Sequence, residues 1–158
     1  MLRDGRDVAI LAVGAMVLAA ERAADDLAAD GIAATVVNAR FVKPLDERLF
    51  LELARTHGAL VTVEESATAG GFGAGVLELL ANHDLTIPAR VLGVPDRIFE
   101  QASQGRLREK AGLTIDGIVA AARAVVRSPL TPLPPSPRSG RGKGEPAALA
   151  GALQIPDA

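Results

Sequence analysis

Residues 61–75 read VTVEESATAGGFGAG and contain the pattern that decides the fold. The stretch begins as an apolar run, reaches the adjacent carboxylates Glu64 and Glu65, and continues through closely spaced glycines. Glycine permits tight turns and close approach of other backbone, so this pattern predicts a short loop that opens a helix. A strand followed by a loop and a helix is the repeating unit of an α/β domain.

The same alternation of apolar runs and helical patterns recurs along the chain. Continuous apolar runs are typical of strands covered on both faces, as in parallel sheets. The expected strands are residues 8–13, 32–37, 60–63 and 90–94. Strand–helix–strand repetition favours right-handed crossovers with helices on both faces. We therefore expect a three-layer α/β/α domain whose mostly parallel sheet has four or five strands.

Helical spacing of apolar residues fills the segments between these runs. The first helix is expected through Met16 and Leu27, with Gly31 in the position that commonly follows a helix C-terminus. Asp46 and Thr114 are suited to cap helices, because their side-chain oxygens accept backbone N–H bonds. Further helices are expected at 73–82 and around Leu107. The predicted buried faces are Leu49, Phe50 and Leu53 after Asp46, and Ile115, Ile118, Val119, Ala122 and Val126 after Thr114.

Composition excludes several classes of chemistry. The chain has no cysteine, so thiol catalysis, disulfides and thiolate metal sites are excluded. A formal net charge of −2 gives no sign of a surface for nucleic acid or an anionic membrane. The uncharged run of residues 8–20 is shorter than the roughly 20 residues of a membrane-spanning helix, and the polar residues before it do not fit a signal peptide. We expect a soluble, cytoplasmic protein that binds neither nucleic acid nor membrane.

Proline divides the chain near residue 128. Seven of the 10 prolines lie between Pro129 and Pro156, and this stretch has no period that would bury one face. The sequence thus predicts a folded domain at residues 1–127 and a Pro-rich disordered tail at 128–158. Two P-x-x-P matches, Pro129–Pro132 and Pro134–Pro137, leave open a role of the tail as a ligand for a partner.

Asp4 and Gly5 form a strong turn signal close to the first residue. Asp-Gly favours a tight hairpin, but few residues precede it. Two interpretations stay open, namely a hairpin that lacks most of its first strand and a surface turn at an ordinary N-terminus.

The glycine-rich loop also has two interpretations. Free N–H groups at a helix N-terminus attract anions, which makes this loop a candidate phosphate or nucleotide site. However, the spacing Gly70-Gly71-x-Gly73-x-Gly75 matches neither common phosphate-binding motif, and Glu64 and Glu65 would repel an anion. Close packing of the helix start against another domain or subunit is the favoured interpretation.

The remaining polar residues do not form a complete catalytic set. Glu64 and Glu65 are adjacent on a strand and should point to opposite faces, so we expect one to be solvated and the other to bind backbone or an arginine. His57 and His83 are expected near helix C-termini, where positive charge is favoured. Arg40 and Lys43, in the long connection of residues 38–46, are candidates to meet a phosphate or an acidic neighbour.

Four motifs in register resemble the C-terminal domain of the transketolase family. They are DVAILAVGAMV at residues 7–17, VVNARFVKPLD at 36–46, VTVEESATAGGFG at 61–73 and GVPDR at 93–97. Within the family, the second and fourth resemble the 1-deoxy-D-xylulose-5-phosphate synthase branch more than transketolase itself or the β subunits of 2-oxo-acid dehydrogenases. The resemblance covers roughly residues 2–127.

This resemblance implies a five-stranded mixed sheet whose first strand, antiparallel to the rest, precedes the turn at residues 3–7 and is missing here. It implies a complete enzyme that condenses pyruvate with glyceraldehyde 3-phosphate and releases carbon dioxide. Thiamine diphosphate and Mg²⁺ would be its cofactors and a homodimer its working form. The chain itself would be a fragment that lacks the N-terminal domains of the same enzyme, is inactive alone, and is marginally stable or self-associates.

The resemblance assigns no catalytic, cofactor-binding or metal-binding residue to this chain, because the family places those residues in the preceding domains. It assigns loops that face neighbouring domains or the partner subunit, namely those with Glu65, Gly70, Gly71, Gly73, Asp96 and Arg97. The family usually continues Pro-Asp-Arg with Phe-Ile-Glu-His-Gly, and residues 98–102 (IFEQA) depart from this string. That departure puts the role of this loop in doubt.

Three alternatives stay open from the sequence. One is the C-terminal domain of another thiamine-diphosphate enzyme, such as transketolase or a 2-oxo-acid dehydrogenase β subunit. Another is a stand-alone nucleotide-binding or anion-binding regulatory module that uses the helix start at Gly70–Gly75. The third is an interaction domain whose Pro-rich tail recruits a partner.

Overall fold

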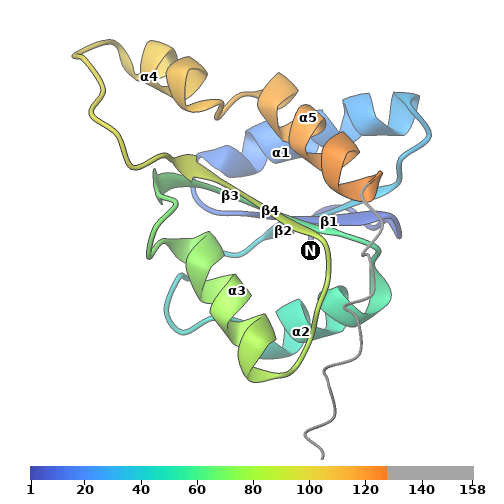
Figure 1. Ribbon diagram of the computed structural model, residues 1–158. Helices are drawn as coiled ribbons and strands as arrows, with labels where there is room; N and C mark the ends of the chain where they lie inside the picture. Colours follow the sequence, from blue (N-terminus) through green and yellow to red (C-terminus); the bar gives the residue numbers. More distant parts are fainter. Residues whose placement is uncertain (128–158) are drawn as a thin grey trace, which may run out of the picture.

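The computed structural model describes residues 1–127, and the predicted Pro-rich tail lies outside the described residues. Strands and helices alternate along this part of the chain, and two helices follow the last strand (Figure 1). In chain order the elements are β1 (Val8–Ala12), α1 (Met16–Ala29), β2 (Ala34–Asn38), α2 (Glu47–Thr56), β3 (Leu60–Ala67), α3 (Phe72–Asn82), β4 (Ala89–Val94), α4 (Gln104–Ala111) and α5 (Ile115–Val126).

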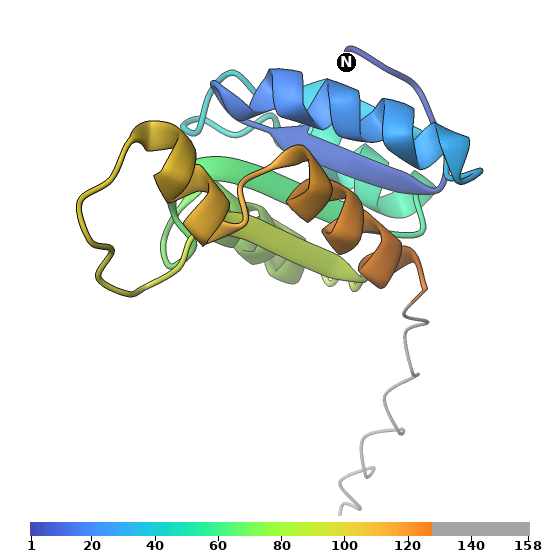
Figure 2. The ribbon, with the colours of Figure 1, turned by 90° about the horizontal axis from the view of Figure 1, so that it is seen from above.

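The four strands form one parallel sheet in the order β2-β1-β3-β4. Helices α1 and α5 cover one face of the sheet, and α2 and α3 cover the other (Figure 1). Seen from above, α1 and α5 run side by side over the strands, while α4 lies beyond the end of the sheet (Figure 2). The predicted three-layer α/β/α architecture with a mostly parallel sheet is confirmed.

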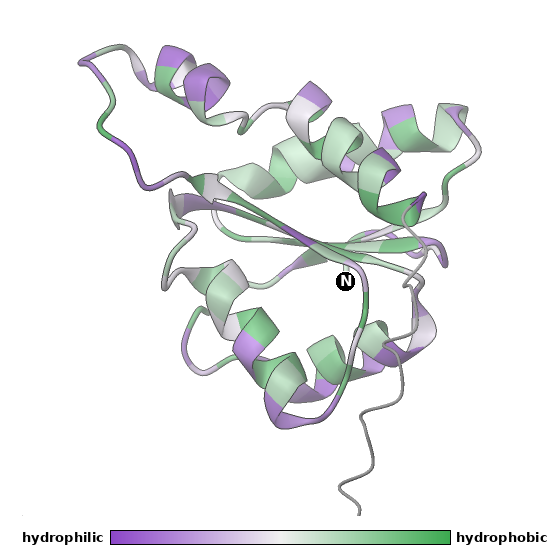
Figure 3. Cartoon of the chain, in the orientation of Figure 1, coloured by the Kyte–Doolittle hydropathy of each residue, from purple (hydrophilic) through white to green (hydrophobic). Residues whose placement is uncertain are grey.

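Each face of the sheet has its own apolar core. β1 is buried along its whole length, so its alternating side chains contribute to both cores. Ile10 faces the core that contains Ile118 of α5, and Leu11 faces the core that contains Phe50 and Phe72. The two rings pack edge to face, with centroids 5.8 Å apart. Figure 3 shows the same pattern, with apolar helix surfaces turned toward the sheet.

Both predicted helix caps are confirmed. The Asp46 side chain accepts a hydrogen bond from the N–H of Leu49 at 3.2 Å, and the Thr114 hydroxyl accepts one from Gly117 at 3.0 Å. Gly31 follows α1 with a φ of 78°, which favours glycine at this position.

Two details of the sequence prediction are wrong. β3 extends from Leu60 to Ala67, so both carboxylates lie inside the strand instead of just after it. Val126 is 37% exposed, whereas its neighbour Val125 is buried. The i, i+4, i+7 spacing of Ile118, Ala122 and Val125 keeps this stripe on the sheet and turns Val126 away.

The N-terminal segment pairs with β2 and not with β1. Arg3 forms an isolated antiparallel bridge with Val36, whose N–H donates to the Arg3 carbonyl at 3.0 Å. The hairpin interpretation of Asp4-Gly5 is therefore wrong in its pairing, because β2 and β3 already occupy both edges of β1. The implied antiparallel element is present as a single bridge at the sheet edge.

Candidate functional site at the carboxyl ends of the strands

The loops that follow the four parallel strands meet at one edge of the sheet, where α/β domains place ligands. These loops are residues 13–15, 39–46, 68–71 and 95–103. The predicted site residues gather around the last two loops, which follow β3 and β4. Glu65 lies in β3, Gly70 and Gly71 in the next loop, Gly73 in the first turn of α3, and Asp96 and Arg97 after β4.

The side chain of Glu64 fills the N-terminus of α3. Glu64 is only 2% exposed. Its two carboxylate oxygens accept hydrogen bonds from the N–H groups of Phe72 at 2.7 Å and Gly73 at 2.8 Å. The Ser66 hydroxyl donates a further bond to the same carboxylate. A negative charge at this position is stabilised by the helix dipole as well as by the three donors.

This arrangement argues against an anion site at the start of α3, which is the less favoured of the two interpretations of the glycine-rich loop. The N–H groups of Phe72 and Gly73, which a phosphate would need, already bind the protein's own carboxylate. An incoming phosphate would also meet the negative charge of Glu64. The positive end of the α3 dipole is thus neutralised by Glu64 of the same chain.

The glycines of this loop permit close packing inside the domain. A Cβ on Gly71 would lie 2.2 Å from the Ala67 carbonyl oxygen and 2.5 Å from a carboxylate oxygen of Glu64. A Cβ on Gly73 would lie 2.4 Å from the Thr62 hydroxyl and 2.5 Å from a Val91 methyl group. The sequence favours close packing against another domain or subunit, whereas the close packing seen here is against β3 and β4 of the same chain. Gly70 has a φ of 75°, a conformation that favours glycine.

Glu65 points away from Glu64 and makes an ion pair with α4. Its Oε1 accepts a hydrogen bond from Arg108 Nε at 2.6 Å, and each side chain is about one-third exposed, at 34% and 32%. The two carboxylates point to different partners, as expected, but neither is simply solvated: Glu64 binds backbone and Glu65 binds an arginine. Their separation also means that they do not form an acid–base pair.

The loop of residues 95–103 is held by Arg97. Its guanidinium donates to the Lys110 carbonyl at 2.6 Å and lies 4.7 Å from the centre of the Phe99 ring. Arg97 therefore binds α4 and its own loop. Ile98, between these anchors, is 100% exposed.

The loop after β2 presents a mixed surface of basic and apolar side chains. Arg40 has a φ of 57°, and its N–H is bound by the Asn38 side chain at 3.0 Å. Phe41 is 65% exposed, and the adjacent Val42 and Lys43 are also exposed. The predicted basic pair is therefore accessible, but it is accompanied by an apolar surface that the sequence pattern did not single out.

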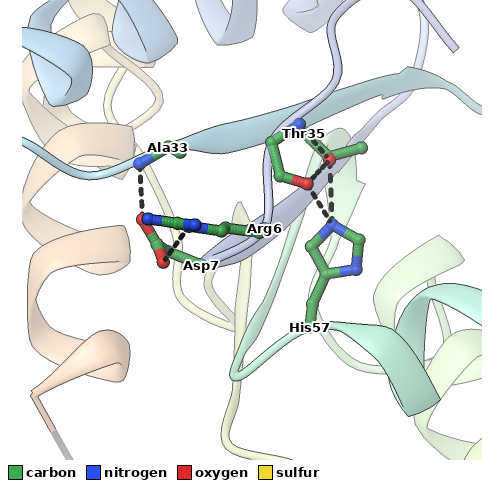
Figure 4. Close-up of polar contacts among 6 residues, drawn as sticks. Arg6, Asp7, Ala33, Thr35 and His57 are labelled. Atoms are coloured by element: carbon green, nitrogen blue, oxygen red, sulfur yellow. Dashed lines mark hydrogen bonds and ion pairs between the residues drawn. The ribbon is translucent and has the colours of Figure 1, made fainter.

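His57 and His83 both lie at helix C-termini, as predicted, but only His57 is part of a polar cluster. In this cluster His57 Nε2 is 2.8 Å from the Thr35 hydroxyl and 3.1 Å from the Gly5 carbonyl (Figure 4). Its Nδ1 is 3.1 Å from the Leu53 carbonyl. His57 thus ties the N-terminal turn to β2 and α2, which is a structural role.

We expect His57→Ala to lower the free energy of unfolding by about 1–2 kcal/mol, because the buried Thr35 hydroxyl and the Gly5 carbonyl lose a half-buried partner. His83→Ala is the matched control, since His83 is exposed and also follows a helix. Its effect should stay within about 0.5 kcal/mol. Urea unfolding followed by far-UV circular dichroism measures both values. Equal effects of the two substitutions would contradict a structural role for His57.

Comparison with known protein families gives a match over residues 1–118 to the model described as the transketolase, C-terminal domain. The chain belongs to this family. The four motifs that resemble this family all lie within the matched residues, around β1, the β2–α2 loop, the β3–α3 junction and the end of β4.

Among curated relatives, the transketolase C-terminal domain described here resembles 1-deoxy-D-xylulose-5-phosphate synthases. It is 60% identical over 118 residues to the enzyme of Thermomicrobium roseum, covering 75% of this chain and 19% of that protein. Over 135 residues it is 49% identical to synthase 1 of Geobacter sulfurreducens, covering 85% of this chain and 21% of that protein. The chain thus spans about one-fifth of the length of these relatives.

A solved structure shares the fold. It is a split-gene transketolase described as an inactive β4 tetramer, with a TM-score of 0.75 and 42% identity. The match covers 79% of this chain and 41% of that one. The synthase relatives are therefore more similar in sequence, while the transketolase shows the same arrangement of strands and helices.

The start of α3 does not fit a diphosphate group. A diphosphate needs free N–H or cationic groups, and those at the start of α3 are bound to Glu64. Residues 1–127 contain no group of three or more His, Cys, Asp or Glu side chains placed to hold a metal ion. In the same part of the chain, no helix is long and apolar enough to cross a membrane.

Proposed function

We propose that residues 1–127 are the C-terminal domain of a 1-deoxy-D-xylulose-5-phosphate synthase. The complete enzyme would join pyruvate to glyceraldehyde 3-phosphate, with loss of carbon dioxide, to give 1-deoxy-D-xylulose 5-phosphate. The observation that carries this proposal is the 60% identity to the Thermomicrobium roseum synthase over 118 residues. In this proposal the enzyme is cytoplasmic, and residues 128–158 are not needed for its reaction.

Within that enzyme the domain would have a role in assembly and not in catalysis. The strongest support is Glu64, which occupies the N–H groups of the one helix start that resembled a ligand site. The neighbouring carboxylate of Glu65 is bound to Arg108. At the opposite end of the sheet, His57 lies within hydrogen-bond distance of the Thr35 hydroxyl and the Leu53 carbonyl. Thiamine diphosphate and Mg²⁺ would then be held by residues of the preceding domains.

The surface at the carboxyl ends of the strands is the proposed contact with those domains or with a partner subunit in a homodimer. Ile98 and Phe41 are exposed apolar side chains on two of its loops. Glu65, Gly70, Asp96 and Arg97 lie on or beside the same loops. Burial of such side chains against another domain or subunit would stabilise the contact. We expect the isolated chain to self-associate, as the split-gene relative described as a β4 tetramer does.

A chimeric enzyme tests this function. The C-terminal part of the Thermomicrobium roseum synthase that aligns with this chain is replaced by residues 1–127 or by residues 1–158. We expect both chimeras to turn over pyruvate and glyceraldehyde 3-phosphate at a rate of the same order as the parent enzyme. We expect the isolated chain to give no turnover.

Each outcome of the chimera experiment bears on a separate part of the proposal. Folded chimeras that bind thiamine diphosphate but have no activity would refute the assignment to the synthase. Turnover by the isolated chain would refute the non-catalytic role. Activity of only the longer chimera would show that residues 128–158 take part.

A further inference from the structure

A small apolar pocket lies under α4, at the carboxyl ends of β3 and β4. Its volume is about 230 Å³. A dry cavity of about 150 Å³ is large enough for benzene, so this pocket has room for one ring with a short chain. The apolar side chains that line it are Val94, Phe99, Leu107, Ala111 and Leu113.

The rim of the pocket is polar and is formed by Gln104 and the ion pair of Glu65 with Arg108. Arg108 uses its Nε atom to bind Glu65, at 2.6 Å. Neither terminal nitrogen of its guanidinium has a hydrogen-bond partner among residues 1–127. These nitrogens can bind a carboxylate side by side, which is a geometry that arginine favours.

Polar contacts and not buried apolar residues hold α4 over this pocket. No residue of α4 is fully buried. The helix is bound through Arg108 to Glu65, through the Lys110 carbonyl to Arg97, and through Lys110 to Glu100 at 3.7 Å. Leu107 and Ala111 remain half-buried on its underside and line the pocket. A ligand that fills the pocket would therefore bury apolar surface that the domain leaves partly open.

From this geometry we infer that the pocket binds a small carboxylate with an apolar body of one ring or a short branched chain. The apolar body would contact Val94, Leu107 and Leu113, and the carboxylate would bind the two terminal nitrogens of Arg108, which Glu65 does not occupy. The negative charge of Glu65 offsets part of this attraction, so most of the affinity would come from the apolar body. The pocket lies on the surface proposed for assembly, but all the residues that line it belong to this chain.

Methyl NMR of the full chain tests the inference with three probes of equal size. Phenylacetate, phenylacetamide and phenethylamine share a benzyl group and the same number of carbon atoms, and their head groups are negative, neutral and positive. We expect phenylacetate to shift the methyl signals of Val94, Leu107 and Leu113 in a saturable way, with a Kd of about 1 mM. The amide should bind roughly fivefold more weakly, because a partly exposed ion pair contributes at most about 1 kcal/mol of binding free energy. The amine should bind more weakly still, because its positive charge is repelled by Arg108.

Variants locate the binding site within the chain. Leu107→Trp fills the pocket and should abolish the shifts, while Arg108→Gln should remove the preference for phenylacetate over phenylacetamide. Arg106→Gln is the matched control. Arg106 is on the same helix and forms an ion pair of 2.9 Å with Glu109, and neither residue lines the pocket. It should leave binding unchanged.

Three results would overturn the inference. They are no saturable shift with phenylacetate, equal binding of the acid and the amide, and unchanged binding by a folded Leu107→Trp chain. If circular dichroism shows that the Leu107→Trp chain is unfolded, the test rests on Arg108→Gln. The Arg108 side chain is about one-third exposed, so this variant should remain folded.

Discussion

Glu64→Gln should lower the free energy of unfolding by about 2–4 kcal/mol, although it changes neither the size nor the shape of the side chain. The carboxylate accepts bonds from the N–H groups of Phe72 and Gly73 and from the Ser66 hydroxyl. An amide has one accepting oxygen, and its NH₂ group would face a donor in this buried site. One N–H at the start of α3 would therefore lose its partner, and the charge that complements the helix dipole would be lost as well.

The neighbouring carboxylate supplies the control for this prediction. Glu65→Gln changes an ion pair that is about one-third exposed, so it should cost at most about 1 kcal/mol. Urea unfolding of the two variants, followed by far-UV circular dichroism, gives both numbers in one experiment. Similar stabilities of the two variants would contradict the capping role of Glu64, and with it the main support for a non-catalytic loop.

Gly73→Ala and Gly75→Ala should change stability in opposite directions, although both lie in α3. A Cβ at position 73 would lie 2.4 Å from the Thr62 hydroxyl and 2.5 Å from a Val91 methyl group. Overpacking of this kind costs about 1–3 kcal/mol. At position 75 the nearest atom is a Leu45 methyl group at 3.7 Å, an ordinary contact. Alanine is the better helix former, so Gly75→Ala should gain up to about 1 kcal/mol.

Thermal unfolding of the two glycine variants gives the sign of each change directly. A domain of this size shifts its Tm by roughly 2–6 °C for each kcal/mol, so both changes are measurable. A gain in stability by Gly73→Ala would show that α3 moves away from the sheet at little cost. In that case the close packing of this helix on β3 and β4 would not explain the glycine.

The candidate site was predictable only in part, and Glu64 shows why. The adjacent carboxylates and the glycine-rich loop are visible in the sequence, and their alternation on a strand correctly separated Glu64 from Glu65. The assignment of the inner carboxylate to the N–H groups of Phe72 and Gly73 was not predictable, because the sequence does not give the distance across the β3–α3 turn. The same limit applies to Arg108, which is 43 residues from Glu65 in the chain.

The sequence by itself determined the order of strands and helices, the parallel sheet and the two helix caps. These features depend on local periodicity and on side chains that bind backbone within a few residues, so they can be read along the chain. Only the tertiary structure decided that the N-terminal segment bridges Val36, that Glu64 closes the helix start, and that a pocket lies under α4. Each of these depends on groups far apart in the sequence, whose contact is set by how the layers pack.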